Sequence, residues 1–299
     1  MISIGIPTYN QADTLGATIE SFLNQSVKPL EIVVSENWCT DHTQEVLKKF
    51  EGKIKVVRPE RHLSMMENWN FLVDHLRGEW FSLMSSDDLA LPNFVSDIFQ
   101  SISENEDAVL VRGPYIIIDS NGDEVDRRTA RYAAKKRDFP ANFYEQIFGT
   151  KTSFSAFSVK KRAFITAGRF EEKLTYSGDY HLWLSLSVVG SFITVAEPVS
   201  KYRYDYRPDI YSKRFNSLIT DNEFIRSKTI LGIYNNWVVK LINGIAVTNS
   251  IREIKKNAPD LDDQMVKKTL SSLYKFKNNW VYDIAGYVLN KVYRLRTIK

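Results

Sequence analysis

The chain has 299 residues, of which 43% are hydrophobic and 25% are charged, and it carries a formal net charge of +4 at pH 7. This length and apolar content are enough for one large or two modest domains with a full hydrophobic core. Its one cysteine, Cys39, excludes an internal disulfide, and we find no apolar stretch near the roughly 18 residues of a membrane span. With no secretory signal visible, we expect a cytoplasmic protein, and the charge is too small to indicate a nucleic-acid partner.

Strand and helix patterns alternate over residues 1–105. Short apolar runs typical of buried strands occupy residues 2–6, 30–34, 54–57 and 80–84. Between these runs, apolar residues recur at helical spacing. Asp41 with Gln44 and Ser64 with Glu67 have the spacing of a capping box, which predicts that Glu67 caps a helix and is not a catalyst. The alternation predicts an α/β fold in which helices cover both faces of a parallel sheet.

Polar residues follow three of the predicted strands. They are Pro7-Thr8-Tyr9-Asn10, Ser35-Glu36-Asn37 and Ser85-Ser86-Asp87-Asp88. Open parallel sheets bind ligands beyond the carboxyl ends of their strands, so these residues are the candidates for a ligand site. The first two turns contain neither G-x-G-x-x-G nor a Lys-Ser/Thr phosphate loop, which argues against a dinucleotide dehydrogenase and a P-loop NTPase.

Asp87 and Asp88 are adjacent carboxylates at the end of a buried strand. They repel each other and lose water there, so we expect a divalent cation, Mg²⁺ or Mn²⁺, to share them. Helix capping accounts for one such carboxylate but less well for a pair. A phosphate-bearing ligand would then be held by the metal and by basic side chains.

Three segments occur in a telling order: residues 2–10, residues 33–41, and the run from Ser85 to Asp88 followed by Leu91-Pro92. Together they resemble the opening motifs of family 2 glycosyltransferases. The resemblance extends over roughly residues 1–205. It implies the GT-A fold, with a nucleotide-sugar-binding half at 1–105 and an acceptor half at 106–214. It also implies transfer of a sugar from a nucleotide-diphosphate sugar to a glycan or lipid-linked acceptor.

The same resemblance assigns roles to the strand ends. Pro7, Thr8, Tyr9 and Asn10 would bind the nucleotide sugar, with Thr8 and Tyr9 lining the base pocket, and Glu36 would face the base. Asp87 and Asp88 match the D-x-D element, in which one carboxylate contacts ribose or sugar and the other helps hold the metal. Ser85 stands where most relatives have an acid, and Glu36 replaces the usual Asp, so weaker metal binding than the family average is implied.

Residues 177–184 resemble the family segment in which an acidic pair precedes an apolar helix. Gly178 replaces the first acid, and Asp179 keeps the second, which is the catalytic base of inverting members. Such a transfer needs a base to take the proton of the attacking hydroxyl. Helix capping is the alternative role for Asp179.

A further family element, Tyr-Arg-x-His, often closes over the diphosphate, and here the corresponding residues are Tyr202 to Asp205. The resemblance makes Arg203 and Arg207 candidate phosphate ligands and Asp205, in the His place, a further candidate metal ligand. A solvated, salt-bridged loop is an equal alternative. The basic stretch at 127–137 indicates solvated surface or a contact with an anionic acceptor or membrane.

From residue 215 onward, helical patterns replace strand patterns, which predicts a C-terminal helical extension at 215–299. Its last part has an apolar stripe from Trp280 to Leu295 beside four cations, Lys291, Arg294, Arg296 and Lys299. Such a stripe suits packing on the catalytic domain, a dimer contact, or peripheral contact with an anionic membrane at the inner face.

We therefore expect a metal-dependent, inverting glycosyltransferase, and the resemblance alone implies a role in surface polysaccharide or glycolipid synthesis. The alternative is a catalytically silent relative that binds nucleotide sugar or partner proteins, favoured by the missing acids at Ser85 and Gly178. A sugar nucleotidyltransferase would need a Gly-rich, Arg-containing phosphate loop near the first strand. The donor base, the sugar, the acceptor and the oligomeric state are not indicated by these residues.

Overall fold

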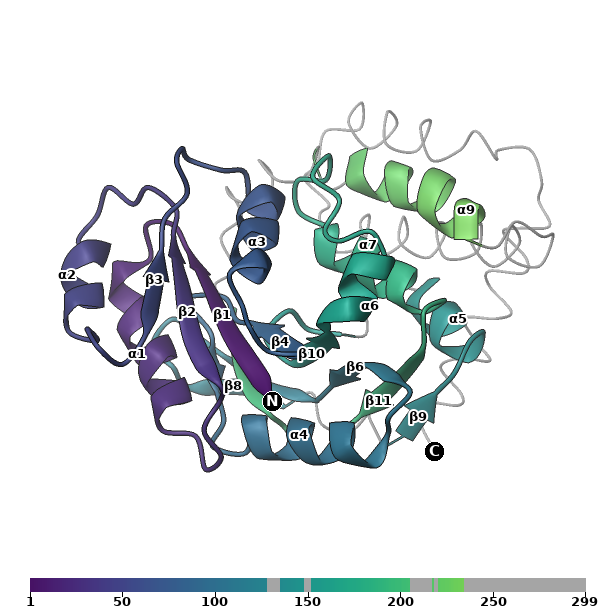
Figure 1. Ribbon diagram of the computed structural model, residues 1–299, viewed down its shortest axis with the longest axis horizontal. Coiled ribbons are helices and arrows are strands. Elements are labelled where there is room, and N and C mark those ends of the chain that lie inside the picture. The colour runs from purple at the N-terminus through teal and green to yellow at the C-terminus, as the bar shows by residue number, and fades with distance from the viewer. Residues whose placement is uncertain (128–134, 148–151, 205–216, 218–219, 234–299) are drawn as a thin grey trace.

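The main sheet of the protein has eight strands and is mixed, with its parallel part at one side (Figure 1). The computed structural model describes residues 1–127, 135–147, 152–204, 217 and 220–233. In spatial order the strands are β3 (Lys55–Val57), β2 (Glu31–Glu36), β1 (Ile2–Thr8), β4 (Trp80–Leu83), β10 (Phe157–Lys160), β6 (Ala108–Arg112), β11 (Ser191–Thr194) and β9 (Lys135–Arg137). The first four pair in parallel, as expected, whereas β10 is antiparallel to both β4 and β6.

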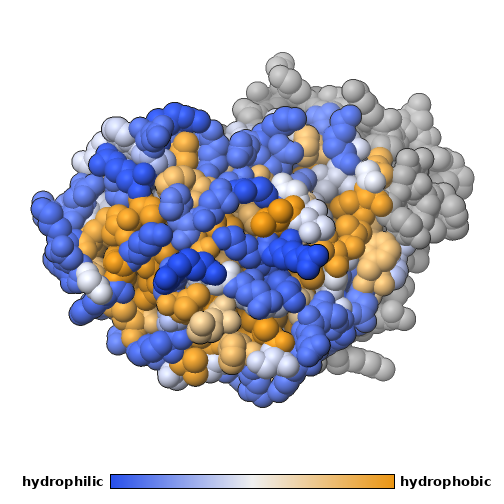
Figure 2. Space-filling model, in the orientation of Figure 1, coloured by the Kyte–Doolittle hydropathy of each residue, from blue (hydrophilic) through white to orange (hydrophobic). Residues whose placement is uncertain are grey.

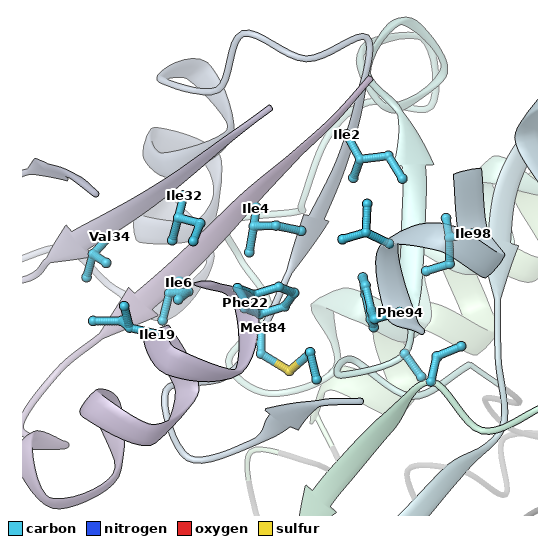
Figure 3. Packing of buried hydrophobic residues seen from close by; sticks show 14 of the residues in the cluster. Ile2, Ile4, Ile6, Ile19, Phe22, Ile32, Val34, Met84, Phe94 and Ile98 are labelled. Atoms are coloured by element: carbon cyan, nitrogen blue, oxygen red, sulfur yellow. The ribbon is translucent and has the colours of Figure 1, made fainter. Parts of the chain in front are cut away.

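Helices cover both faces of this sheet, as the sequence predicts (Figure 1). One face packs against α1 (Ala12–Leu23), α2 (Thr43–Lys48) and α4 (Phe94–Glu104). The other packs against α3 (Met65–Asp74), α6 (Lys161–Thr166) and α7 (Gly178–Leu186). Figure 3 shows the first of these cores, in which Ile4 and Ile6 of β1 meet Phe22 of α1 and Phe94 of α4. Strand side chains alternate between faces, so every second residue of β1 enters this core.

Two predicted helix starts have different outcomes. Glu67 accepts the N–H of Ser64 at 2.8 Å and completes the capping box of α3, so this prediction is confirmed. The predicted capping box of Asp41 with Gln44 is wrong, because α2 begins at Thr43. Asp41 instead accepts the N–H groups of Thr43 and of Ala12. Asp41 therefore ties the start of α2 to the start of α1.

A second, four-stranded sheet joins residues 89–90 to strands from residues 115–203, and it was not predicted. Its order is β5 (Leu89–Ala90), β12 (Ser200–Arg203), β7 (Tyr115–Ile118) and β8 (Glu124–Arg127). The turn between β7 and β8 contains Gly122 at φ +93°, which a residue without a Cβ adopts readily. This sheet brings β12 beside the residues that follow β4.

The described residues beyond 214 are helical and pack on the acceptor half. They include η1 (Ile225–Ile230), a segment with wide π-type turns, and α9 (Leu231–Ile233). Ile225 and Ile230 share one core with α5 (Ala141–Ile147) and α7. The predicted boundary at 214/215 stays a prediction, and the apolar stripe from Trp280 onward lies outside the described residues.

The surface of the described residues mixes polar and apolar groups on the face shown in Figure 2. Across the described ranges, no helix has both the length and the apolar character needed to cross a membrane. Both lysines of β9 are paired: Lys136 lies 2.6 Å from Asp107, and Lys135 lies 3.7 Å from Glu145. In this part of the basic stretch, the solvated-surface interpretation fits the contacts.

Candidate functional site

The ends of β1 and β2 form one hydrogen-bonded unit, as their parallel register requires. Thr8 pairs with Glu36, and the N–H of Asn37 reaches the carbonyl of Thr8 at 3.1 Å. Cys39 bridges the two turns, because its Sγ accepts the N–H of Asn10 and lies 3.7 Å from the Thr8 carbonyl oxygen. Burial raises the pKa of this thiol, so it stays protonated between the two turns. The Thr8 hydroxyl is buried and has no hydrogen-bond partner among the described residues.

Glu36 is almost fully buried, at 1% exposure, and both of its oxygens contact protein groups. Oε1 accepts the N–H of Cys39, and Oε2 lies 3.1 Å from Nε of Arg58. The Arg58 guanidinium in turn stacks 4.3 Å from the ring centre of Trp38. A base facing Glu36, as predicted, would therefore meet an ion pair and an indole ring.

Two exposed aromatic residues flank this ion pair. Trp38 is 42% exposed and Tyr9 49% exposed, and the Tyr9 ring lies edge-on to His62 with 4.7 Å between ring centres. Asn37 holds the loop that carries His62, because its amide exchanges two hydrogen bonds with the backbone of Leu63. Half-exposed rings with fixed neighbours offer flat apolar surfaces on which a nucleobase can stack.

The acidic loop after β4 is held from two sides. The Thr18 hydroxyl of α1 lies 2.7 Å from the Asp88 carbonyl oxygen and 3.0 Å from that of Ser86. Asp88 is buried, at 1% exposure, whereas Asp87 is only partly buried. The Oδ1 atom of Asp88 accepts the N–H of Arg203 in β12 at 2.7 Å. Asp87 is therefore the more accessible carboxylate of the pair.

Burial and the neighbouring Asp87 raise the pKa of Asp88 well above its usual value, against the opposing effects of Arg203 and Ser155. Oδ2 of Asp88 is buried with no hydrogen bond of ordinary geometry to a described residue, although the Ser155 hydroxyl is near enough to act on the carboxyl. Ser155 is there because β10 runs antiparallel to β4, so its start adjoins the end of β4. Two adjacent carboxylates, one with an oxygen that lacks a hydrogen bond, suit a divalent cation. The phosphates of a ligand would complete the coordination shell of such a cation. In the described part of the chain, no three His, Cys, Asp or Glu side chains come together as a metal site.

The side chain of Arg203 is hydrogen-bonded to backbone carbonyls of the protein. Its Nε donates to the Asp87 carbonyl at 3.0 Å, and its Nη1 donates to the carbonyls of Asp119 and Ser120 at 2.8 Å each. Three of its N–H groups thus fix the acidic loop against the β7–β8 turn, so phosphate binding by Arg203 stays a prediction. Arg207 and Asp205 lie outside the described residues.

The structure places Asp179 in the first turn of α7, where Ser177 and not Asp179 occupies the N-cap position. Its Oδ1 accepts the N–H of Tyr180 at 2.7 Å. Burial raises the pKa of Asp179 to about 6, because the surrounding protein disfavours the charged form. A carboxylate with this pKa is mostly deprotonated, and still basic, near neutral pH.

The start of α7 lies against the first turn of α3. A Cβ placed on Gly178 would overlap Sδ of Met66, a side chain that is fully buried. Because α3 follows β3, its first turn lies at the carboxyl edge of the parallel strands. The structure therefore brings Asp179 to the edge that carries Thr8, Glu36 and the acidic loop.

Sequence reasoning missed several groups that build this edge. Thr18 reads as a helix residue, Ser155 lies between predicted elements, and Tyr202 was noted only as part of a motif. Burial and then the charges of Asp88 and Asp87 raise the pKa of Tyr202 to about 12, so its hydroxyl stays protonated beside the acidic pair. No local pattern signals these contacts, because each joins distant parts of the chain.

Several known proteins resemble this chain. The profile of the family described as "Glycosyl transferase family 2" matches residues 3–165. An uncharacterized glycosyltransferase of Rickettsia typhi is 29% identical over 210 residues, 68% of this chain and 64% of that protein. Another, of Methanocaldococcus jannaschii, is 26% identical and matches 71% of this chain and 74% of its own length. The chain thus spans slightly less than two thirds of the Rickettsia protein.

Solved structures share the fold. TarS 1-349 of S. aureus in complex with UDP-GlcNAc superposes with a TM-score of 0.73 and 16% identity, over 92% of this chain and 80% of that one. The complex of the same fragment with UDP gives a TM-score of 0.71 and 15% identity, over 91% and 79% of the two chains. The architecture is the GT-A type that the motifs imply, with the parallel strands at one side of the sheet.

Proposed function

Because this chain belongs to glycosyl transferase family 2, we propose that it transfers a sugar from a nucleotide-diphosphate sugar to a hydroxyl acceptor with inversion at the anomeric carbon. The observation that carries the proposal is Asp179, whose pKa is raised to about 6 at the sheet edge where the acidic loop lies. A base placed there and an acidic pair suited to a diphosphate supply the two requirements of such a transfer.

The proposed donor is a nucleotide-diphosphate sugar, and UDP-linked donors are the first to test. TarS, which shares the fold, is described in complex with UDP-GlcNAc and with UDP. In this chain, Tyr9 and Trp38 present half-exposed rings beside the Glu36–Arg58 ion pair. These groups would stack the base and read its polar edge, while Pro7, Thr8 and Asn10 shape the turn beneath it.

In the proposed reaction, the acceptor oxygen forms a bond to the anomeric carbon as the bond to the diphosphate oxygen breaks. The diphosphate leaves with the electron pair, and Asp179 takes the proton of the acceptor hydroxyl. Attack from the face opposite the leaving group inverts the configuration. Burial keeps Asp179 basic enough to accept the proton and still deprotonated in most molecules above pH 6.

Asp87 and Asp88 would hold a divalent cation, Mn²⁺ or Mg²⁺, with Asp205 as a further proposed ligand. When bound, such an ion neutralises the charge of the departing diphosphate. The fit rests on the free Oδ2 of Asp88 and on the partial exposure of Asp87. Arg203 holds this loop in place through its backbone contacts, and Arg207 remains a proposed phosphate ligand.

The acceptor is proposed to be a glycan or a lipid-linked glycan in surface polysaccharide or glycolipid synthesis. Four cations beside an apolar stripe in residues 280–299 would suit loose contact with an anionic membrane, at about 1 kcal/mol per cation. Truncation after Asn279 should abolish salt-sensitive sedimentation with anionic liposomes and leave donor hydrolysis intact. Loss of nucleotide binding on truncation would instead assign the stripe to the core.

Thermal-shift screening with UDP, GDP and their sugar conjugates, each with and without Mn²⁺, tests the donor. A ligand at a hundred times its dissociation constant adds about 2.7 kcal/mol of stability, which a shift in Tm reports. Release of UDP from UDP-GlcNAc, with water as acceptor, then tests catalysis. Binding without turnover under any metal condition would favour the silent relative suggested by Ser85 and Gly178.

A further inference from the structure

Asp221 binds the backbone just ahead of α7 from a distant part of the chain. Its side chain is almost completely buried, at 2% exposure, in the described segment 220–233. It accepts the N–H of Thr175 at 3.1 Å on each oxygen, that of Tyr176 at 2.7 Å and that of Ser177 at 2.9 Å on Oδ2. Three successive N–H groups therefore converge on one carboxylate, which has no part in the chemistry proposed above.

This carboxylate binds the N-cap residue of α7 and the two residues before it, so it fixes the backbone that leads into the helix. Ser177 is the N-cap residue, and its side chain makes no capping hydrogen bond. The N–H groups at a helix start need acceptors, and a negative charge there is favourable. Asp221 places such a charge just ahead of the helix, and its hydrogen bonds restrain the φ and ψ angles of residues 175–177. Asp179 follows two residues after Ser177, so its direction depends on this backbone.

The other end of the same loop is fixed from α3. Asn70, which is buried, donates its amide to the Phe170 carbonyl at 3.0 Å and accepts the Phe170 N–H at 3.1 Å. The loop is thus anchored near its start by the nucleotide-binding half and at its end by the segment after residue 214. The residues that Asp221 binds are closer to Asp179 along the chain than Phe170 is, and they lead directly into α7.

We propose that Asp221 is a positioning residue for Asp179, so that the segment following the acceptor half sets the direction of the base. The proposal rests on the proposed function, in which Asp179 takes the acceptor proton. A displacement of about 1 Å at a reacting group can lower the rate about a hundredfold. Loss of the carboxylate would remove up to four charge-assisted hydrogen bonds from the loop.

Asp221→Asn is the informative variant, since it keeps the side-chain shape and one oxygen. With UDP-GlcNAc and water as substrates, we expect kcat to fall about tenfold to a hundredfold, while KM and the calorimetric affinity for UDP stay at wild-type values. The rise of kcat through pH 6 should remain, because Asp179 is still the base. Hydrogen exchange should quicken at the amides of residues 175–177. Glu223→Gln, the same chemical change on the same segment, should leave all these values unchanged.

The outcomes separate the two proposals. Wild-type kcat and wild-type exchange in Asp221→Asn would overturn the positioning role, as would equal losses of kcat and UDP affinity, which indicate general damage. Wild-type kcat in Asp179→Asn would instead overturn the base assignment, whatever Asp221 does. Asp221→Ala should lower kcat further than Asp221→Asn, and if it fails to fold, the Asn variant still decides the question.

Discussion

Asp179 combines a raised pKa with a place in the first turn of a helix, and its protonation state should control catalysis. Its pKa of about 6 means that the rate should fall about tenfold for each pH unit below 6 and level off above it. In Asp179→Asn the rate should be lower by about a hundredfold to ten-thousandfold and independent of pH in this range. Donor hydrolysis measured from pH 4.5 to 8 checks this. A pH-dependent, wild-type rate in the variant would place the base elsewhere.

The same pKa makes Asp179 a source of instability at neutral pH. A carboxyl whose pKa is higher in the folded than in the unfolded protein binds more protons when folded. Its contribution to stability is therefore full below about pH 4 and lost as pH rises through 6. We expect Asp179→Asn to raise the free energy of unfolding by about 1–3 kcal/mol at pH 7.5 and by little at pH 4. Urea unfolding at the two pH values checks this, and equal effects at both would contradict it.

The acidic pair should make nucleotide binding depend on a divalent cation. Asp88→Asn keeps an oxygen for the Arg203 N–H but removes the charge, so the loop should hold its place. We expect UDP affinity in Mn²⁺ to fall about tenfold to a hundredfold and to become insensitive to chelator, and Asp87→Asn to weaken it as well. Calorimetric titration is the measurement, with Asp13→Asn as the exposed control. Chelator-insensitive binding in the wild type would remove the metal from the mechanism.

Among the elements, the contact between α3 and α7 fixes the position of Asp179, the proposed base, and Gly178 permits this contact. A methyl group at position 178 would overlap Met66, so Gly178→Ala should cost about 1–3 kcal/mol of stability. In a Met66→Ala background, the same change should be neutral or stabilising by up to about 1 kcal/mol, because alanine favours helix. A double-mutant cycle by urea unfolding measures the coupling. Purely additive effects would show that the two residues do not meet.

The elements also show where sequence reasoning succeeds. Strands β1 to β4 and helices α1 and α3 follow from hydrophobic periodicity, because each buries a regular face. The antiparallel insertion of β10 between β4 and β6 could not be predicted, since periodicity does not name a strand's partner. The two-residue β5 is too short for any pattern. The carboxylates of the site were found through motifs, whereas Asp221 and Ser155 act across long sequence distances and carry no local signal.

At the scale of the whole molecule, the acceptor half and the residues after 214 share one core. A chain ending at residue 214 would lack Ile225 and Ile230, which pack with Phe143 and Leu184. At about 1.5–3 kcal/mol for each buried isoleucine, we expect about 3–6 kcal/mol less stability than in a chain ending at residue 233. Urea unfolding of the two truncated chains measures the stability that residues 215–233 contribute. Equal stability would support an independent boundary at 214/215.

The hydrogen bond between Asp88 and Arg203 has a consequence for how the protein is made. The two residues are 115 positions apart in the chain, and Arg203 also donates to the Asp87 carbonyl. A ribosome that adds about 5–20 residues per second needs roughly 6–23 s to travel from one to the other. During that interval the nascent chain has all four parallel strands but not the partner that closes the acidic loop. The acidic loop, the proposed diphosphate site, is therefore completed late in synthesis, after the parallel strands that support it.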